Sequence, residues 1–229
     1  MYLPIFKGPL RGTLWATNSR GKIPRILLGS YEREQTQSFV DRIRPGDTVL
    51  DIGSHAGYYT ALSSRLVGSK GKVVAFEPDG QNANFLHAHI RINRFRNVTA
   101  VDKAVGKSRG TVRFTTGTGS GTGHICEEGA VEVPLCTVDD VVAEMDLQPT
   151  HMKIDVEGAE MDVLEGAHQT LCQWRPVIYL STHGPDVHAA CCQHLAEQGY
   201  TLTPLLGDEL ATTTEVLCVP NCQAQRSAA

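Results

Sequence analysis

The sequence of 229 residues lacks the features that mark several special classes of protein. No apolar run approaches the roughly 20 residues needed to cross a bilayer. Residues 1–7 lack the apolar segment of a secretory signal. A formal net charge of −4 gives no basic excess for a nucleic-acid surface. We therefore expect a cytoplasmic protein with no membrane span and no nucleic-acid partner.

The seven cysteines are odd in number and show no Cys-x-x-Cys spacing. Reduced, buried thiols explain them better than a disulfide framework or a zinc site. What remains is an ordinary globular composition, 41% hydrophobic and 20% charged, with a length that fits one α/β domain.

Short apolar runs alternate with helical patterns through most of the chain, which predicts an α/β fold with a doubly wound, mostly parallel sheet. Expected strands cover 48–52, 73–77, 98–101, 151–156 and 176–180, with a last pair at 200–203 and 215–219. Expected helices cover 31–43, 82–93, 137–145, 159–171 and 186–198. Residues 111–115 and 131–135 predict a paired β insertion, with a mobile glycine-rich loop at 117–123.

Three segments follow from this pattern. Residues 1–30 are an N-terminal extension and candidate lid, with a short strand at 26–28. Residues 31–222 form the main domain. Residues 223–229 are expected to be disordered.

The stretch from Asp51 to Gly57 is the most informative part of the chain. A buried strand runs into a small-residue loop and then into a helix, so the loop faces the crevice at the strand's carboxyl end. The spacing Gly-x-x-x-Gly differs from the Gly-x-Gly-x-x-Gly of a dinucleotide site. It fits a ligand with a zwitterionic amino-acid end, such as S-adenosylmethionine.

Side chains at the other strand ends belong to the same crevice. Glu77 ends the second strand, 26 residues after Asp51, where a carboxylate can accept hydrogen bonds from both hydroxyls of a ribose. Asp51 either binds the ammonium group of the ligand or caps the loop. His55 either faces the ligand or caps the helix.

Two residues near the fourth and fifth strands are candidate catalytic groups. Asp155 either orients or deprotonates an acceptor hydroxyl, holds the ligand amine, or pairs structurally with Lys153. His183 is the preferred base, because a neutral imidazole near pH 7 suits a hydroxyl; the alternative is a packing role. A metal site of Asp155, Glu157 and His183 is chemically feasible, but its spacing is not diagnostic, so we expect no metal.

Several motifs resemble the FkbM-type methyltransferase family. They include Gly29-Ser-Tyr-Glu32, residues 45–60, Val74-Ala-Phe-Glu-Pro78, Ala104-Val-Gly106, residues 137–140, the octapeptide Lys153-Ile-Asp-Val-Glu-Gly-Ala-Glu160, and Ser181-Thr-His-Gly184. The resemblance covers roughly 28–205 and departs from the common pattern at Ser54-His55.

This resemblance implies a Rossmann-like fold with a seven-stranded sheet and methyl transfer from S-adenosylmethionine, usually to oxygen. The residues that it assigns to the cofactor are Asp51, Gly53, Ser54, His55, Gly57, Tyr58, Glu77, Pro78, Asp102, Lys103, Ala104 and Asp155. Candidate acceptor contacts are Glu32, Glu157 and His124. The acceptor is expected to be a small molecule such as a secondary metabolite, sugar or polyketide, and a homodimer is compatible with the sequence. The alternatives are an NAD-dependent oxidoreductase and a non-catalytic S-adenosylmethionine-binding protein.

Overall fold

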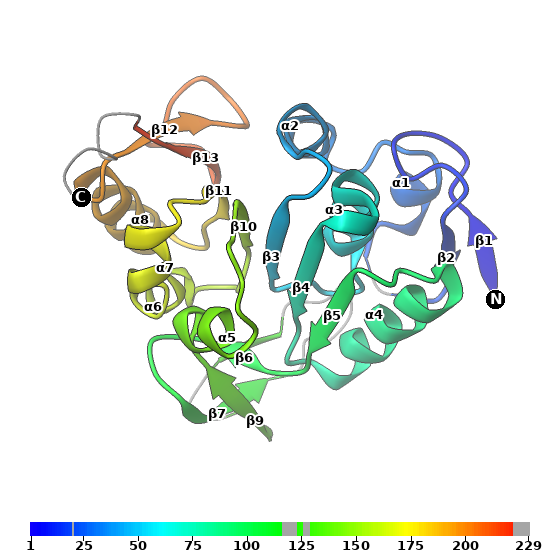
Figure 1. Cartoon of the computed structure of the whole chain (residues 1–229), viewed down its shortest axis with the longest axis horizontal. Helices are drawn as coiled ribbons and strands as arrows, with labels where there is room; N and C mark the ends of the chain where they lie inside the picture. The colour runs from blue at the N-terminus through cyan, green and yellow to red at the C-terminus, as the bar shows by residue number, and fades with distance from the viewer. Residues whose placement is uncertain (20, 116–122, 126–128, 222–229) are drawn as a thin grey trace.

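A computed structural model shows an α/β domain built on one seven-stranded sheet (Figure 1). It describes residues 1–19, 21–115, 123–125 and 129–221. The strand order is β12-β13-β11-β10-β3-β4-β5. In that order the strands span Tyr200–Pro204, Glu215–Pro220, Val177–Ser181, His151–Ile154, Thr48–Ile52, Lys72–Phe76 and Val98–Val101. The predicted fold class is confirmed.

Strands β11, β10, β3, β4 and β5 run parallel, so their carboxyl ends share one edge of the sheet. The predicted last pair of strands is present and antiparallel. Strand β13 also pairs antiparallel with β11, so it lies inside the sheet and β12 forms the edge. Because β13 runs in the opposite direction, its first residue joins the edge where the parallel strands end.

Helices cover both faces of this sheet (Figure 1). Leu50 and Ile52 pack into one core with α5 to α8 (Val138–Glu144, Glu160–Glu165, His168–Gln173 and Pro185–Glu197). Val49 points to the opposite face and packs with α2 and α3 (Arg33–Arg42 and Tyr58–Val67). Helix α4 (Gly80–Asn93) follows β4, and a 3-10 turn (Gly68–Lys70) follows α3. Alternation along β3 turns Asp51 to the α2–α3 face.

The helix predicted over 159–171 is wrong in one respect, because it consists of the two short helices α6 and α7. They part at Gly166 and Ala167. A side chain on Gly166 would overlap the backbone carbonyl of Gly106, so the break lets two segments approach closely.

The predicted β insertion is confirmed as part of a four-stranded sheet. Its order is β6-β9-β7-β8, with β6 at Ala104–Val105, β7 at Gly110–Thr115, β8 at His124–Ile125 and β9 at Val131–Cys136. Strands β7 and β9 pair antiparallel. Most of the loop predicted at 117–123 and the tail at 223–229 lie outside the described residues.

The N-terminal segment packs on the domain. Strands β1 (Tyr2–Pro4) and β2 (Leu14–Ala16) form a small sheet, and the backbone of β2 is hydrogen-bonded to His89 and Asn93 of α4. The strand predicted at 26–28 is wrong, because Ile23–Leu27 is the helix α1. Pro24 in its first turn is compatible with helix initiation, since no helical N–H is lost there.

No helix among the described ranges is long and apolar enough to span a membrane.

Candidate active site

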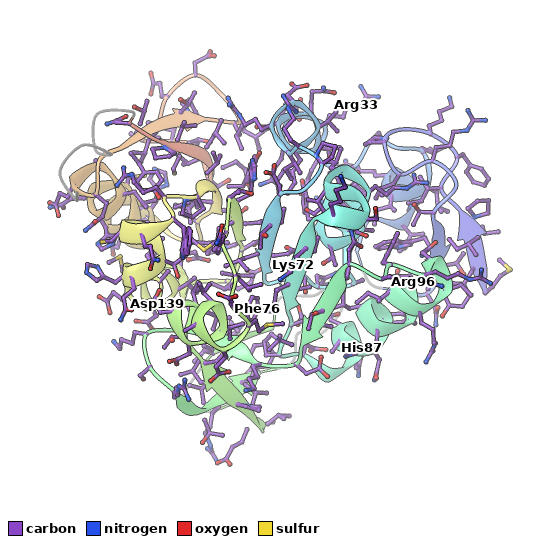
Figure 2. All side chains as sticks on the ribbon, in the orientation of Figure 1. Arg33, Lys72, Phe76, His87, Arg96 and Asp139 are labelled. Atoms are coloured by element: carbon purple, nitrogen blue, oxygen red, sulfur yellow. The ribbon has the colours of Figure 1, made fainter. Side chains whose placement is uncertain are left out.

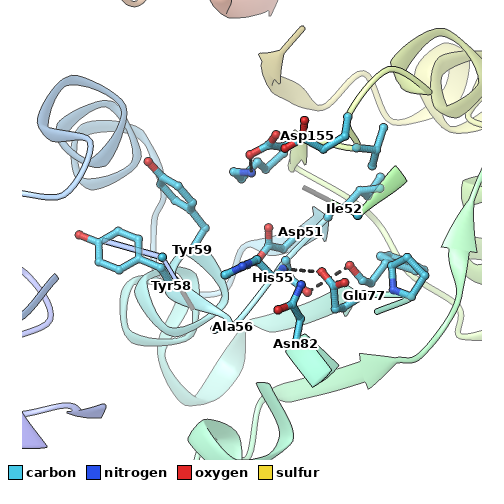
Figure 3. Close-up of a pocket in the computed structure, with 18 of the residues that line it drawn as sticks. Asp51, Ile52, His55, Ala56, Tyr58, Tyr59, Glu77, Asn82 and Asp155 are labelled. Carbon is cyan, nitrogen blue, oxygen red and sulfur yellow. Dashed lines mark hydrogen bonds and ion pairs between the residues drawn. The ribbon is translucent and has the colours of Figure 1, made fainter. Parts of the chain in front are cut away.

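A cavity of about 450 Å³ opens at the edge where the parallel strands end (Figure 3). The predicted residues that line it are Glu32, Asp51, Gly53, Ser54, His55, Tyr58, Glu77, Pro78, Lys103, Ala104, Asp155, Glu157 and His183. The sheet therefore brings most of the predicted site together, from segments far apart in the chain.

Gly53 sets the shape of the loop after β3. Its φ of 80° is one that side chains rarely adopt, and a Cβ there would overlap the carbonyl oxygen of Asp155. The N–H groups of Gly53 and Ser54 both donate to the carbonyl of Phe76. The glycine thus holds the loop against the ends of both β10 and β4.

Glu77 is buried at the end of β4, with its carboxylate already partly engaged. It accepts hydrogen bonds from the backbone N–H of His55, at 2.6 Å, and of Asp79, at 2.9 Å. Burial raises the pKa of this carboxyl to about 7, although these two hydrogen bonds oppose the rise. A carboxylate has about four lone-pair sites, so these hydrogen bonds leave acceptor capacity for a ligand.

Asp51 is fully buried on the cavity wall. One carboxylate oxygen accepts a hydrogen bond from Thr60 Oγ1 at 2.5 Å, and the other has no partner among the described residues. Burial raises the pKa of this group, and the charge of Lys153 opposes the rise. Burying a carboxylate oxygen without a partner costs free energy, because the oxygen loses its hydrogen bonds to water. A cationic ligand group at this point would replace those hydrogen bonds.

Asn82 and Trp15 line the same cavity and were missed by the sequence reasoning. The Asn82 Oδ1 acceptor and the Trp15 Nε1 donor are buried without a partner in the described structure. Asn82 lies in the first turn of α4, the helix that starts shortly after Glu77. The first turn of this helix is therefore close to the loop that follows β3. Trp15 comes from the N-terminal segment and stacks on His89 at 3.9 Å, which no local pattern indicates.

Lys153 and Asp155 form an ion pair on the β10 side, with Nζ 2.9 Å from Oδ2. Lys153 is 2% exposed and lies 5.1 Å from the centre of the Tyr59 ring. Burial alone would lower the pKa of Lys153, but the charges of Asp155 and Asp51 hold it above its usual value. Burial would likewise raise the pKa of Asp155, and Lys153 holds it below its usual value. Both groups are charged at neutral pH.

His183 lies between three carboxylates after β11. Its Nδ1 is 2.9 Å from Glu160 Oε1, and its Nε2 is 3.4 Å from Glu157 Oε2 and 3.8 Å from Asp155 Oδ1. The hydrogen bond to Glu160, together with the neighbouring negative charges, raises the pKa of the imidazole to about 9. The sequence reasoning assumed a neutral ring near pH 7, whereas among these carboxylates the ring is mainly protonated there.

Residues 51–202 match the family model of the methyltransferase FkbM domain, which spans more than half of the chain. The chain belongs to the FkbM methyltransferase family.

Solved structures of methyltransferases share the fold of this FkbM chain. A methyltransferase FkbM from Methylobacillus flagellatus KT is 17% identical with a TM-score of 0.60, over 86% of this chain and 52% of that one. A precorrin-6y C5,15-methyltransferase from Geobacter metallireducens GS-15 is 17% identical with a TM-score of 0.51, over 89% and 91%. A putative rRNA methylase from Clostridium thermocellum is 11% identical with a TM-score of 0.52, over 81% and 92%.

The present chain spans about half the length of the Methylobacillus protein. No curated protein matches it.

Three predicted residues of the FkbM site do not line the cavity: Gly57, Asp102 and His124. Gly57 immediately precedes α3 as its N-cap, with a φ of 91°, and a Cβ there would press on Leu86, so it supports helix packing. Asp102 pairs with the exposed His87 at 2.8 Å on the outer side of α4 (Figure 2). His124 is exposed, although its neighbours Gly123 and Ile125 do line the cavity.

Glu215 is a further cavity residue that the sequence reasoning missed. It accepts hydrogen bonds from Ser181 Oγ at 2.7 Å and Gln35 Nε2 at 2.9 Å, and burial raises its pKa to about 7. One feature could have indicated Glu215. If the last strand runs antiparallel to its neighbour, its first residue lies at the edge of the sheet where the parallel strands end.

Ligand atoms of Asp155, Glu157 and His183 lie within 4.8 Å of one another. These are groups that a divalent cation accepts, but only with the imidazole deprotonated at Nε2. Our expectation that the FkbM chain needs no metal stays a prediction.

Proposed function

We propose that this protein transfers the methyl group of S-adenosylmethionine to a hydroxyl oxygen of a small, polar acceptor. The observation that carries most weight is the fully buried Asp51 oxygen that has no partner in the described part of the chain; Asp51 lines the cavity beside the Gly53 loop and Glu77. Each of these groups suits one feature of cofactor binding. Asp51 suits the ammonium group, the Gly53 loop suits a close approach of the backbone, and Glu77 suits the ribose.

The donor end of the cavity fits the cofactor in three respects. Asp51 would accept from the ammonium group, which provides the missing partner of its buried oxygen. The unused lone pairs of Glu77 would accept from the two ribose hydroxyls. The lack of room for a side chain at Gly53, against the Asp155 carbonyl, fixes the path of the loop that borders the cavity.

The acceptor end lies between β10, β11 and the N-terminal part of the chain. Glu32, Glu157 and Glu215 contribute carboxyl groups there, and Tyr59 donates its hydroxyl to Glu32 at 2.8 Å. These groups offer hydrogen bonds to hydroxyls and amines and oppose carboxylates or phosphates. A hydroxyl-rich acceptor such as a sugar therefore suits the cavity better than an apolar polyketide.

When bound, S-adenosylmethionine supplies an electrophilic methyl carbon on a sulfonium, which needs only alignment with the acceptor oxygen and removal of its proton. His183 Nε2 would take that proton as the new oxygen–carbon bond forms and the sulfur–methyl bond breaks, the sulfur leaving as the neutral thioether of the demethylated product. Asp155, fixed by Lys153, would orient the hydroxyl from the other side. The base works from the neutral fraction of the ring, because a protonated imidazole cannot accept.

Calorimetric titration with S-adenosylmethionine and its demethylated product tests the donor part of this proposal. We expect saturable binding at one site, and a variant D51N with much weaker affinity. A transfer assay with labelled methyl groups, over sugars, phenols and carboxylic acids, tests the acceptor part. Wild-type protein that binds neither cofactor form would overturn the function.

Other features stay predictions within this proposal. The segment 1–30 is a candidate lid, since Trp15, Lys22 and Ile26 line the cavity. Five cysteines in the described structure are free thiols, which suits a reducing compartment such as the cytoplasm. Homodimerisation remains compatible with the sequence.

A further inference from the structure

Glu160 is a fully buried carboxylate behind the cavity wall, at the start of α6. It does not line the cavity, and the proposed reaction gives it no part. Its Oε1 accepts from three donors: Val156 N at 3.3 Å, Gly158 N at 3.0 Å and His183 Nδ1 at 2.9 Å. Its Oε2 has no hydrogen-bond partner among the described residues. A group that is so costly to bury needs a compensating role.

The contact with Glu160 determines which ring nitrogen of His183 is available. Because a carboxylate accepts and does not donate, Nδ1 must carry a proton. In the neutral ring the lone pair therefore lies on Nε2, the nitrogen on the side of Asp155 and Glu157. Both of these side chains line the cavity, so Nε2 is the atom that an acceptor hydroxyl can reach.

Glu160 also holds the loop that joins β10 to α6. Within this loop Glu157 has a φ of 56° and Gly158 a φ of 107°. The same carboxylate oxygen therefore fixes the imidazole and the loop that carries Glu157. The two sides of the proton-accepting site cannot move independently while Glu160 is in place.

We propose that Glu160 is a positioning residue for methyl transfer, which holds His183 in its Nδ1–H form with Nε2 toward the acceptor hydroxyl. This role rests on the proposed function. Glu160 touches neither acceptor nor cofactor, and it acts on the reaction only through His183 and the adjoining loop.

The charged groups around His183 come from two elements. Asp155 and Glu157 face it from the end of β10 and the following loop, with Lys153 paired to Asp155. Glu160 faces it from α6. A Glu160→Gln change keeps an oxygen acceptor for Nδ1–H and removes one of three nearby acidic groups. The pKa of the ring should therefore fall, while the tautomer is kept.

Nitrogen-15 NMR of the histidine rings in the wild-type protein tests the geometry without any need for activity. The resonance of His183 is assigned by its loss in H183N. We expect the neutral ring to carry its proton on Nδ1 and to titrate near pH 9. A neutral ring protonated mainly on Nε2 would overturn the proposal, and because the wild-type protein is used, a failure of a variant to fold cannot obscure the result.

The variant E160Q then tests the consequence, with E165Q as its matched control on the exposed side of the same helix. We expect the acidic limb of kcat/KM against pH to move down by at least one unit in E160Q and to stay in place in E165Q. The affinity for S-adenosylmethionine should change less than threefold. E160A should lower kcat at least tenfold at high pH, because Nδ1 loses the acceptor that fixes the tautomer and orientation of the ring.

If E160Q folds and the acidic limb of its kcat/KM profile does not move, Glu160 has only a structural role and the proposal fails. If the NMR result holds but no variant or wild-type protein transfers methyl groups, the proposed function fails while the assignment of the tautomer stands.

Discussion

The two ends of the cavity are built differently. The donor end comes from the neighbouring strands β3 and β4 and their loops: two buried carboxylates, Asp51 and Glu77, stand beside a loop whose backbone is fixed by the turn at Gly53 and by the two N–H groups that Glu77 binds. The acceptor end collects side chains from the start of α2, from the loops after β10 and β11 and from the first residue of β13, among them Glu32, His183 and Glu215. It is held together by hydrogen bonds between side chains.

This difference in construction determines how well each end of the cavity tolerates substitution. A site whose groups come from two adjacent strand ends and one fixed loop tolerates few changes, because every group depends on the same local chain path. A site made of side chains from distant segments can change one group at a time without altering the fold. We therefore expect mutations at the donor end to affect cofactor affinity and those at the acceptor end to affect turnover.

The largest effect is expected from His183→Ala. Loss of a general base lowers kcat by about 10²- to 10⁴-fold, while the affinity for S-adenosylmethionine should stay within threefold. His168→Ala, on the exposed side of α7, is the matched control and should leave kcat unchanged. Initial rates at saturating donor and calorimetry measure the two quantities, and an unchanged kcat would remove His183 from the reaction.

The pH profile of the wild-type enzyme sharpens this prediction. The pKa of His183 lies near 9, and the base must be neutral. The rate should therefore rise with pH up to about 9, and below that value it should fall about tenfold for each unit. A plateau that already begins near pH 6.5 would contradict the contacts seen around the ring.

Gly53→Ala should have the next largest effect, at the donor end. Its φ of 80° costs about 1–2 kcal/mol for alanine, and the overlap with the Asp155 carbonyl adds strain. We expect a loss of about 3 kcal/mol in unfolding free energy and about 100-fold weaker donor binding. Gly46→Ala is the control, since Gly46 has a φ of 96° with nothing near its Cβ position. Equal losses in both variants would show that overlap is unimportant.

The same contrast explains how much of the molecule could be predicted from sequence. The strand after residue 48, Gly53 and Glu77 follow one another along the chain, so a local pattern predicts them. Strand β13 and Glu215 could be placed at the edge only after the pairing order was known, because a sequence does not state which strand inserts between two others. The break in the 159–171 helix lies where Gly166 packs against the backbone of Gly106, a long-range contact that no helical pattern includes.

The protonation of His183 was missed for a related reason. Its position after a strand was predictable, but its pKa depends on Glu160, 23 residues earlier in the chain, and on two further carboxylates. Likewise, Trp15 reaches the cavity because β2 packs on α4. Long-range packing, and not local propensity, sets these features.

Glu77→Gln should have a moderate effect, confined to the donor. Hydrogen bonds to a charged acceptor are worth about 1.5–3 kcal/mol, so donor affinity should fall about tenfold to a hundredfold with kcat nearly unchanged. Because the pKa of Glu77 is near 7, wild-type affinity should also weaken as the pH falls below 7, and that of the variant should not. An equal response to pH in both proteins, measured by calorimetry, would argue against the ribose role.

The same pKa has a consequence for the ligand-free fold. A carboxyl whose pKa is higher in the folded than in the unfolded state costs stability once it ionises. This cost grows as the pH rises from about 4.5 to about 7. The difference in unfolding free energy between the wild-type protein and E77Q should therefore grow in favour of E77Q over this range.

The smallest effect is expected from Asp102→Ala, which distinguishes side-chain from backbone recognition at the far side of the donor end. By analogy with the family, Asp102 was expected to flank the adenine of the cofactor, but its carboxylate is exposed and paired with His87, whereas the next two residues, Lys103 and Ala104, line the cavity. If the chain path alone borders the adenine, donor affinity should change less than threefold, as judged by calorimetry. A tenfold loss would mean that the side chain turns inward when the cofactor binds, so that the donor end too depends on a mobile side chain.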